Sequence, residues 1–149
     1  MDIADEARLS GGALEKLLRA GHFVVTSETT PPLSADPATL LANVAPLRGV
    51  ADAVNVTDGA GARSHMSSLA AAALLAREGI EPVLQLTLRD RNRLALQNDL
   101  LGAAALGVAN VMCLHGDDVA GGDQPDAKMV HDLDSAGLIA LACSMRDEG

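Results

Sequence analysis

The sequence predicts an α/β protein built on a parallel β-sheet. Short apolar runs alternate four times with segments of helical periodicity, and glycines such as Gly79 and Gly107 end the helical segments. Strands that alternate with helices pair in parallel, because each connection crosses over through a helix. Polar, turn-forming residues follow every apolar run. The candidate site is therefore expected at the carboxyl edge of the sheet.

A leading helix, four strands and four further helices are expected in order. Leu14, Leu17 and Leu18 have helical spacing and indicate the leading helix. Asp36 and Pro37 suit the N-cap and the first position of the next helix. The expected strands cover 23–27, 53–56, 82–86 and 108–114, and the later helices cover 64–78, 92–106 and 134–145.

The apolar strands leave two architectures open. A continuous run such as VMCL, residues 111–114, is typical of a sheet that is buried on both faces. A small doubly wound sheet and half of an eight-stranded β/α barrel both meet this description. Both architectures bind ligands at the carboxyl ends of their strands, so the place of the site does not depend on the choice.

Composition and charge exclude several classes of protein. The 149 residues, 48% of them apolar, suffice for one domain with a substantial core. A formal charge of -9 argues against a nucleic acid or an anionic membrane as partner. Cys113 and Cys143 lack the spacing of a metal site or a disulfide framework, and we recognise no signal peptide or membrane span. We expect a soluble, cytoplasmic protein without a metal.

Glu28 is the first candidate for chemistry. It ends the first apolar run, within FVVTSETTPP, and the prolines that follow stiffen the loop. On a central strand its carboxylate would enter a cleft partly shielded from water, where a carboxylic acid can deliver a proton near neutral pH. The alternative is a solvated loop glutamate or a helix-capping residue.

Aspartates after the fourth strand are the second candidate. Asp117 and Asp118 follow Gly116, and a glycine lets a ligand approach the backbone closely. Their presence is equally explained by loop solubility. His115, at the same strand end, is a possible site residue, whereas His131 is interpreted as a surface loop histidine.

Three arginines after the third strand form the densest basic cluster of the chain. Arg89, Arg91 and Arg93 lie where a helix begins, and both a helix amino end and a guanidinium suit a phosphate. Pairing with Asp90 and Asp99 is the equally weighted alternative.

Taken together, the strand ends resemble the amino-terminal half of the methylenetetrahydrofolate reductase family. FVVTSETTPP is similar to the family's first-strand motif, an acidic residue between apolar positions followed shortly by Pro-Pro. NVTDGAGARSH, residues 55–65, resembles its Val-Thr-x-Gly-Ala segment. The stretch from LQLTLRDRNR to CLHGDD, residues 84–118, is similar to the third and fourth strands and the helix between them. The resemblance spans roughly residues 22–145.

The resemblance implies a fold and an activity. The fold is a β/α (TIM-type) barrel, of which residues 1–149 form a single domain with about four strand–helix units, a half barrel. The cofactor is FAD, with FMN as a possibility, bound across the carboxyl ends of the strands. Reduced flavin passes a hydride to 5,10-methylenetetrahydrofolate and yields 5-methyltetrahydrofolate, and NAD(P)H supplies the electrons. A non-catalytic folate-binding or one-carbon-complex subunit of the same fold is the alternative.

The resemblance also assigns residues. Glu28 matches the acid that helps to open the methylene bridge, and Asp117 matches the aspartate near the pyrimidine edge of the flavin, where it also meets the folate. Four further residues fall at positions that contact flavin in relatives, and Arg91 of the basic cluster is added to the cofactor site. The four are Thr57, Gln85, His115 and Gly116. Asp58, Gln85 and His115 stand where relatives frequently have Tyr, His and Arg.

A half barrel leaves the two edges of its sheet open, which is a pairing hazard. We therefore expect, besides the folate substrate, either a homo-oligomer in which copies close a barrel, or completion by the missing half, with a fragment of a longer protein as the favoured interpretation. A third, weaker hypothesis is a small doubly wound binding domain unrelated to folate.

Overall fold

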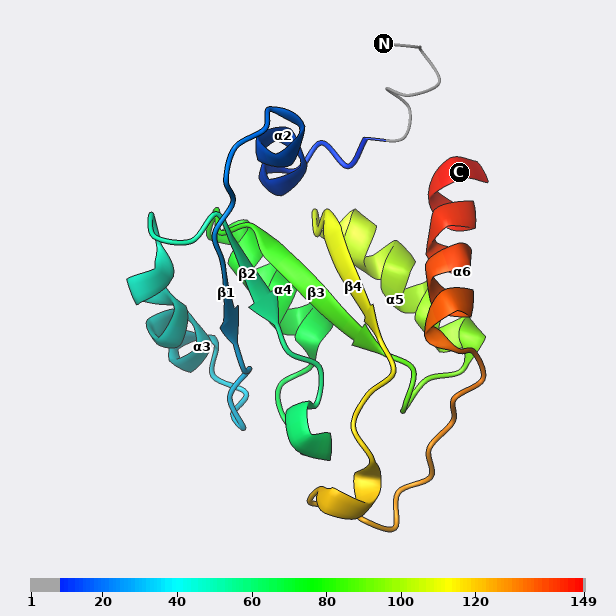
Figure 1. Cartoon of the computed structure of the whole chain (residues 1–149). Helices are drawn as coiled ribbons and strands as arrows, with labels where there is room; N and C mark the ends of the chain where they lie inside the picture. The colour runs from blue at the N-terminus through cyan, green and yellow to red at the C-terminus, as the bar shows by residue number, and fades with distance from the viewer. Residues whose placement is uncertain (1–8, 149) are drawn as a thin grey trace.

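Four parallel strands form one sheet in the computed structural model, which describes residues 9–148. The strands lie side by side in the order of the sequence, so that their carboxyl ends meet at one edge (Figure 1). They are β1 (Thr26–Thr29), β2 (Ala53–Val56), β3 (Pro82–Thr87) and β4 (Asn110–Leu114). The predicted α/β class with a parallel sheet is confirmed.

Helices connect and flank the strands. The α-helices are α2 (Ala13–Arg19), α3 (Pro37–Val44), α4 (Ser68–Arg77), α5 (Arg93–Ala105) and α6 (Ser135–Glu148). Short 3-10 turns follow α3 and the ends of β2 and β4, at η1 (Ala45–Leu47), η2 (Ala60–Ala62) and η3 (Val119–Gly121). No helix within residues 9–148 combines the length and the hydrophobicity needed to cross a bilayer.

Local chemistry explains where two of these helices begin. Asp36 caps α3, because its carboxylate accepts a hydrogen bond from Ala38 N at 3.0 Å, as predicted. The helix expected from residue 64 begins instead at Ser68, and the Ser67 hydroxyl accepts from Ala70 N at 3.1 Å. The helix begins later than predicted because Gly59 and Gly61 have positive φ angles and turn the chain sharply before it.

The core lies on one face of the sheet. Val54, Val56 and Leu84 pack against apolar residues of α3, α4 and α5. Leu86 packs against Leu96 of α5 and Leu138 of α6. A doubly wound sheet has helices on both faces and reverses its strand order. The one-sided, sequential arrangement seen here is that of consecutive units of a β/α barrel.

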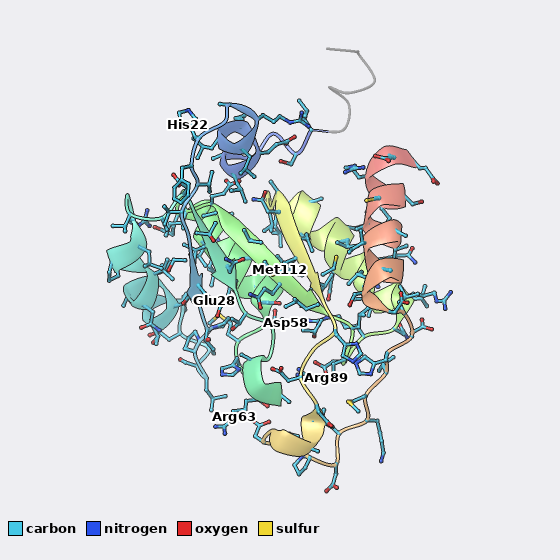
Figure 2. All side chains as sticks on the ribbon, viewed as in Figure 1. His22, Glu28, Asp58, Arg63, Arg89 and Met112 are labelled. Carbon is cyan, nitrogen blue, oxygen red and sulfur yellow. The ribbon has the colours of Figure 1, made fainter. Side chains whose placement is uncertain are left out.

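The opposite face, called the open face below, is uncovered within residues 9–148. It carries the side chains that alternate with those of the core, among them Glu28, Asn55, Gln85 and Met112. Met112 is 40% exposed and lies on this face (Figure 2). The expectation that VMCL is buried on both faces is therefore wrong for the described residues, because α3, α4, α5 and α6 all pack on the other side.

The expected first strand also shifts. The strand begins at Thr26 and ends at Thr29, two to three residues later than predicted. Phe23, the only aromatic residue of the chain, lies before it and is 92% exposed. The apolar run 23–25 is thus not a buried strand, because it lies before β1, and β1 itself has a neighbour on one side only within residues 9–148.

Candidate functional site

A pocket of about 320 Å³ opens at the carboxyl ends of the strands. Every strand contributes to it, because parallel strands bring their ends to one edge. Its lining is Glu28, Thr57, Asp58, Ala60, Gln85, Thr87, Leu114, His115, Gly116 and Asp117. Six of the seven predicted site residues are thus brought together, and Arg91 is the one that does not line the pocket. The chemical roles assigned to them stay predictions.

A larger pocket of about 530 Å³ lies elsewhere, between α5, α6 and the segment that enters β4. Its lining is mostly apolar, with Leu100, Val111 and Met145 among its members. Ligand sites that perform chemistry need convergent polar groups. We therefore take the smaller, polar pocket as the candidate site.

The carboxylate of Glu28 lies on the open face and is held there by one hydrogen bond. Gln85 Nε2 donates a hydrogen bond to Glu28 Oε2 at 3.0 Å, across the intervening strand β2. The second carboxylate oxygen accepts no hydrogen bond within residues 9–148. Glu28 is exposed, so the expectation of a central strand and a shielded cleft is wrong for the described residues. The cause is the position of β1 at the edge of the sheet, beside the uncovered open face.

Thr57 brings an unpaired hydroxyl to the pocket. The residue is only 5% exposed, and its Oγ1 atom is buried without a hydrogen-bond partner among the described residues. Its backbone N–H, in contrast, donates to Thr29 O at 3.1 Å. A buried hydroxyl without a partner is costly, so a hydrogen-bonding ligand that enters the pocket would gain a ready contact.

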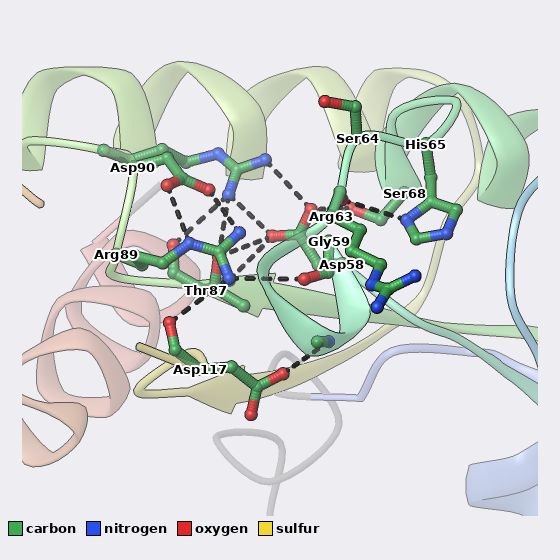
Figure 3. A network of polar contacts seen from close by, with 12 residues as sticks. Asp58, Gly59, Arg63, Ser64, His65, Ser68, Thr87, Arg89, Asp90 and Asp117 are labelled. Carbon is green, nitrogen blue, oxygen red and sulfur yellow. Dashed lines mark hydrogen bonds and ion pairs between the residues drawn. The ribbon is translucent and has the colours of Figure 1, made fainter. Parts of the chain in front are cut away.

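Asp58 is the centre of a buried polar network (Figure 3). Its Oδ2 accepts from Thr87 N and Thr87 Oγ1, both at 2.9 Å, and its Oδ1 accepts from Ser68 Oγ at 3.0 Å. Arg91 Nη1 donates to Asp58 Oδ2 at 2.6 Å. Burial alone would raise the pKa of the Asp58 carboxyl, but Arg91 and the hydrogen bonds from Thr87 hold it below its ordinary value of 3.8.

Arg91 is satisfied by carboxylates of the chain itself. Besides Asp58, it donates through Nε to Asp99 Oδ2 at 2.8 Å, and its side chain is 17% exposed. Burial would lower the pKa of Arg91, yet the two carboxylates raise it. The sequence analysis gave pairing with Asp99 as the alternative to binding a phosphate, and the structure shows this pairing. The cofactor role of Arg91 remains a prediction.

Arg89 connects the loops that follow β2 and β4. The residue is 5% exposed, and its Nη1 donates to Gly59 O at 3.2 Å and to Asp117 O at 3.4 Å. Asp90 receives two hydrogen bonds from the same guanidinium, each 2.8 Å long. Arg89 thus acts as a clamp across the end of β3, with Asp90 fixing the plane of its fork.

Asp117 is fixed from two sides. Its Oδ2 accepts from Gly61 N at 2.7 Å, while its backbone carbonyl accepts from Arg89. The preceding Gly116 has φ +94°, and a Cβ there would stand 2.9 Å from Arg89 Cβ and 3.3 Å from Thr87 Cβ. Only a glycine allows the chain to pass so closely over β3 and deliver Asp117 to the pocket.

His115 stacks on a histidine that the sequence analysis left at the surface. The rings of His115 and His131 are parallel within 8°, with centroids 4.2 Å apart. His131 is half-buried and has φ +43°, so its interpretation as a simple surface loop residue is wrong. The backbone hydrogen bond from Val130 N to Arg89 O, 2.7 Å long, holds this segment beside the site.

The roles of three polar residues at the site were not predicted from the sequence: Thr87 was not named, Asp58 was noted only as a departure from the family pattern, and Arg89 only as one arginine of the basic cluster. Thr87 follows Gln85 by two positions, so strand periodicity alone could have placed it on the same face. Asp58 directly follows β2, which also marks it as an edge residue. The burial of Arg89 carries no comparable signal, because it depends on two loops that are remote in the sequence.

These features define a class of protein: a β/α-barrel protein whose polar pocket lies at the carboxyl ends of its strands, where barrel enzymes have their active sites. Residues 13–144 match the methylenetetrahydrofolate reductase family, and the chain belongs to that family. The match confirms the resemblance and the barrel class, with the four described strand–helix units as a partial barrel. A search of the curated proteins finds no match.

Proposed function

We propose that the chain is a cytoplasmic, flavin-dependent reductase, which converts 5,10-methylenetetrahydrofolate to 5-methyltetrahydrofolate with electrons from NAD(P)H. Family membership supports a reductase-like function of this kind. The observation that carries the proposal is the convergence of a glutamate, an aspartate and an unpaired buried hydroxyl at one pocket. These are Glu28, Asp117 and Thr57.

The residues of the pocket fit one edge of a flat, polar ring system. Thr57 offers the unpaired hydroxyl, Gly116 an approachable backbone, and Asp117 a carboxylate whose Oδ2 is already held by Gly61 N. A flavin bound here would supply the hydride. Asp117, Thr57 and Gly116 would bind and orient its edge.

Glu28 would hold the proton that the reaction requires. The hydrogen bond from Gln85 fixes one carboxylate oxygen, and the other has no hydrogen-bond partner among residues 9–148 and is free to meet a substrate. In this role Glu28 delivers a proton to the folate nitrogen that is released when the methylene bridge opens, while the bridge carbon accepts the hydride. Gln85 would set the direction of that carboxylate rather than take part in proton transfer.

The test separates the cofactor from the chemistry. The purified chain is titrated with FAD and with FMN, and flavin absorbance and fluorescence report binding. Glu28→Gln is compared with the native chain for flavin binding and for oxidation of the reduced flavin by 5,10-methylenetetrahydrofolate. We expect Glu28→Gln to retain flavin and to lose folate reduction by at least about a hundredfold, the scale of general acid catalysis.

Two results would count against the proposal. If the chain binds neither FAD nor FMN, the proposed cofactor is wrong. If a Glu28→Gln variant reduces folate at the native rate, Glu28 is not the acid of the reaction. Folate binding without any turnover would instead favour a non-catalytic folate-binding subunit.

A further inference from the structure

His131 carries two local costs beside the pocket. Its backbone has φ +43°, a left-handed conformation that a glycine adopts more easily than a residue with a Cβ. Its Nε2 atom is buried and has no hydrogen-bond partner among residues 9–148, which is also unfavourable. An apolar side chain would fill the same space without the second cost. Folds retain such strained and unsatisfied residues chiefly at functional sites.

The segment that carries His131 is anchored on both sides. Val130 N donates to Arg89 O at 2.7 Å. Asp132 accepts from Arg93 N and Nε, at 2.9 and 2.8 Å, and from Arg93 Nη2 at 3.0 Å. Because Arg89 is buried and follows β3, these bonds tie the segment to the carboxyl edge of the sheet.

The ring of His131 lies flat against the ring of His115. The two rings are parallel within 8°, and their centroids are 4.2 Å apart. His115 follows β4 and lines the pocket, whereas His131 is not among the residues that line it. The torsion that turns a histidine ring has broad minima, so a ring without a neighbour has no single orientation. His131 covers one face of His115 and restricts that rotation.

We propose that His131 is a positioning residue, which holds the imidazole of His115 in one orientation so that its ring edge meets a planar, hydrogen-bonding ligand in the pocket. A ring that is already fixed loses less conformational entropy when the ligand binds, and the ligand therefore binds more tightly. The inference rests on the proposed function in taking flavin as this ligand. The fixed orientation of His115 does not depend on it.

The geometry of the stack excludes a shared metal ion as the alternative. The lone pairs of the ring nitrogens lie in the planes of the rings, and two parallel, stacked planes do not converge on one point. Within the described part of the chain, no group of three or more metal-ligating side chains is found. The stack therefore serves orientation.

Variants of two histidines separate the flat ring from its polar atoms. His131→Leu removes the ring, whereas His131→Phe keeps it and removes the unpartnered nitrogen. Neither leucine nor phenylalanine is branched at Cβ, so both meet the same left-handed backbone on similar terms. His65→Leu is the control. His65 is also half-buried, but its Nδ1 contacts Arg63 O at 3.0 Å, and it does not line the pocket.

The first measurement needs no ligand. NMR relaxation of the Cε1–H group of His115 reports the motion of the ring on the picosecond to nanosecond timescale. We expect a rigid ring in the native chain, in His131→Phe and in His65→Leu, and a mobile ring in His131→Leu, while far-UV circular dichroism shows that every variant is folded. A His115 ring that is mobile in the native chain, or equally rigid in His131→Leu, overturns the inference.

The second measurement is a fluorescence titration with FAD. The loss of one oriented hydrogen bond should raise the dissociation constant about fivefold in His131→Leu, whereas His131→Phe and His65→Leu should bind like the native chain. In a chain that already carries His115→Ala, His131→Leu should cost no further affinity.

The two measurements distinguish the inference from the proposed function. If His131→Leu binds FAD like the native chain, or if His131→Phe binds as weakly as His131→Leu, the inference is wrong and the proposed function stands. If the native chain binds neither FAD nor FMN, the proposed function is wrong. The relaxation of His115 then decides the inference by itself: a ring that is rigid in the native chain and mobile only in His131→Leu supports it, and any other pattern overturns it.

Discussion

The carboxylate of Asp58 and the guanidinium of Arg91 form a buried ion pair, 2.6 Å long, at the carboxyl edge of the sheet. Asp58 follows β2, and Arg91 precedes α5. The same carboxylate accepts two hydrogen bonds from Thr87, at the end of β3. One side chain therefore joins a loop, a strand and the start of a helix, and it sets the shape of the pocket edge.

Asp58→Asn should destabilise the fold. The substitution keeps the size of the side chain but leaves Arg91 with one carboxylate instead of two. Breaking a buried pair typically costs about 3 kcal/mol, and we expect a loss of about 2–3 kcal/mol here because Asp99 still pairs with Arg91. Urea denaturation followed by circular dichroism gives the free energy of unfolding.

The control for this variant is Asp132→Asn. Asp132 pairs with Arg93 at 2.8 Å, but both side chains are solvent-exposed, and exposed pairs contribute little. A loss in Asp132→Asn equal to that in Asp58→Asn would contradict the special importance of the buried pair.

The same carboxylate should shape the acid stability of the chain. Because the pKa of Asp58 is lower in the folded state than its ordinary value of 3.8, the carboxylate stabilises the fold fully above that value. This contribution is lost as the pH falls through the folded pKa. The difference in melting temperature between the native chain and Asp58→Asn should therefore narrow below about pH 4.

Melting curves between pH 7 and pH 2.5 check this expectation. Glu15 and Asp132 also have lowered pKa values, each about 2, but both residues are the same in the native chain and in Asp58→Asn, so their titration cancels in the comparison. Only the difference between the two proteins reports on Asp58. A difference that stays constant down to pH 2.5 would mean that the pKa of Asp58 is the same in the folded and the unfolded chain, which would contradict its lowered pKa in the fold.

The sequence was informative where a signal is local. Asp36 correctly predicted the start of α3, and the predicted strand 53–56 has the same bounds as β2. The meeting of Glu28, Thr57 and Gly116 followed from parallel pairing combined with the family resemblance, because parallel strands must end at one edge.

What the sequence missed depends on neighbours in space. The exposure of Phe23 could not be foreseen, because a run of apolar residues does not reveal whether a strand has one neighbour or two. The stacking of His115 on His131 joins residues sixteen positions apart through an irregular loop. The pairing of Arg91 with Asp58 required knowing that β2 and β3 are adjacent, whereas the pairing with Asp99, eight positions further along the chain, was foreseen as an alternative.

Thr57→Val should separate stability from ligand binding. Valine has the shape of threonine without the hydroxyl, which is buried and unpaired in the described residues. Removing an unsatisfied polar atom should leave the stability unchanged or raise it by up to about 1 kcal/mol. If a bound flavin uses this hydroxyl, its dissociation constant should rise about five- to tenfold, the equivalent of one hydrogen bond.

Thr87→Val is the matched control. Thr87 is equally buried, but its hydroxyl donates to Asp58 at 2.9 Å, so its removal should lower stability. Thermal melting and flavin titration on both variants complete the comparison. A clear loss of stability in Thr57→Val would show that its hydroxyl has a partner in solution.

Arg89→Lys should weaken ligand binding through Asp117. A lysine keeps the positive charge, but a single ammonium cannot hold Asp90 in a fork and reach the carbonyls of Gly59 and Asp117 at once. With the clamp loosened, we expect the position of Asp117 to relax and the affinity for flavin to fall about tenfold, the scale of coupling between neighbouring residues.

A double-mutant cycle distinguishes this positioning role from general damage to the fold. If Arg89 acts through Asp117, then Arg89→Lys should cost little further affinity in a chain that already carries Asp117→Asn. Fully additive losses would instead assign Arg89 to the stability of the loops alone. The visible spectrum of bound flavin gives a second readout, since a displaced Asp117 should shift it in Arg89→Lys as in Asp117→Asn. A spectrum that changes only in Asp117→Asn would contradict the clamp.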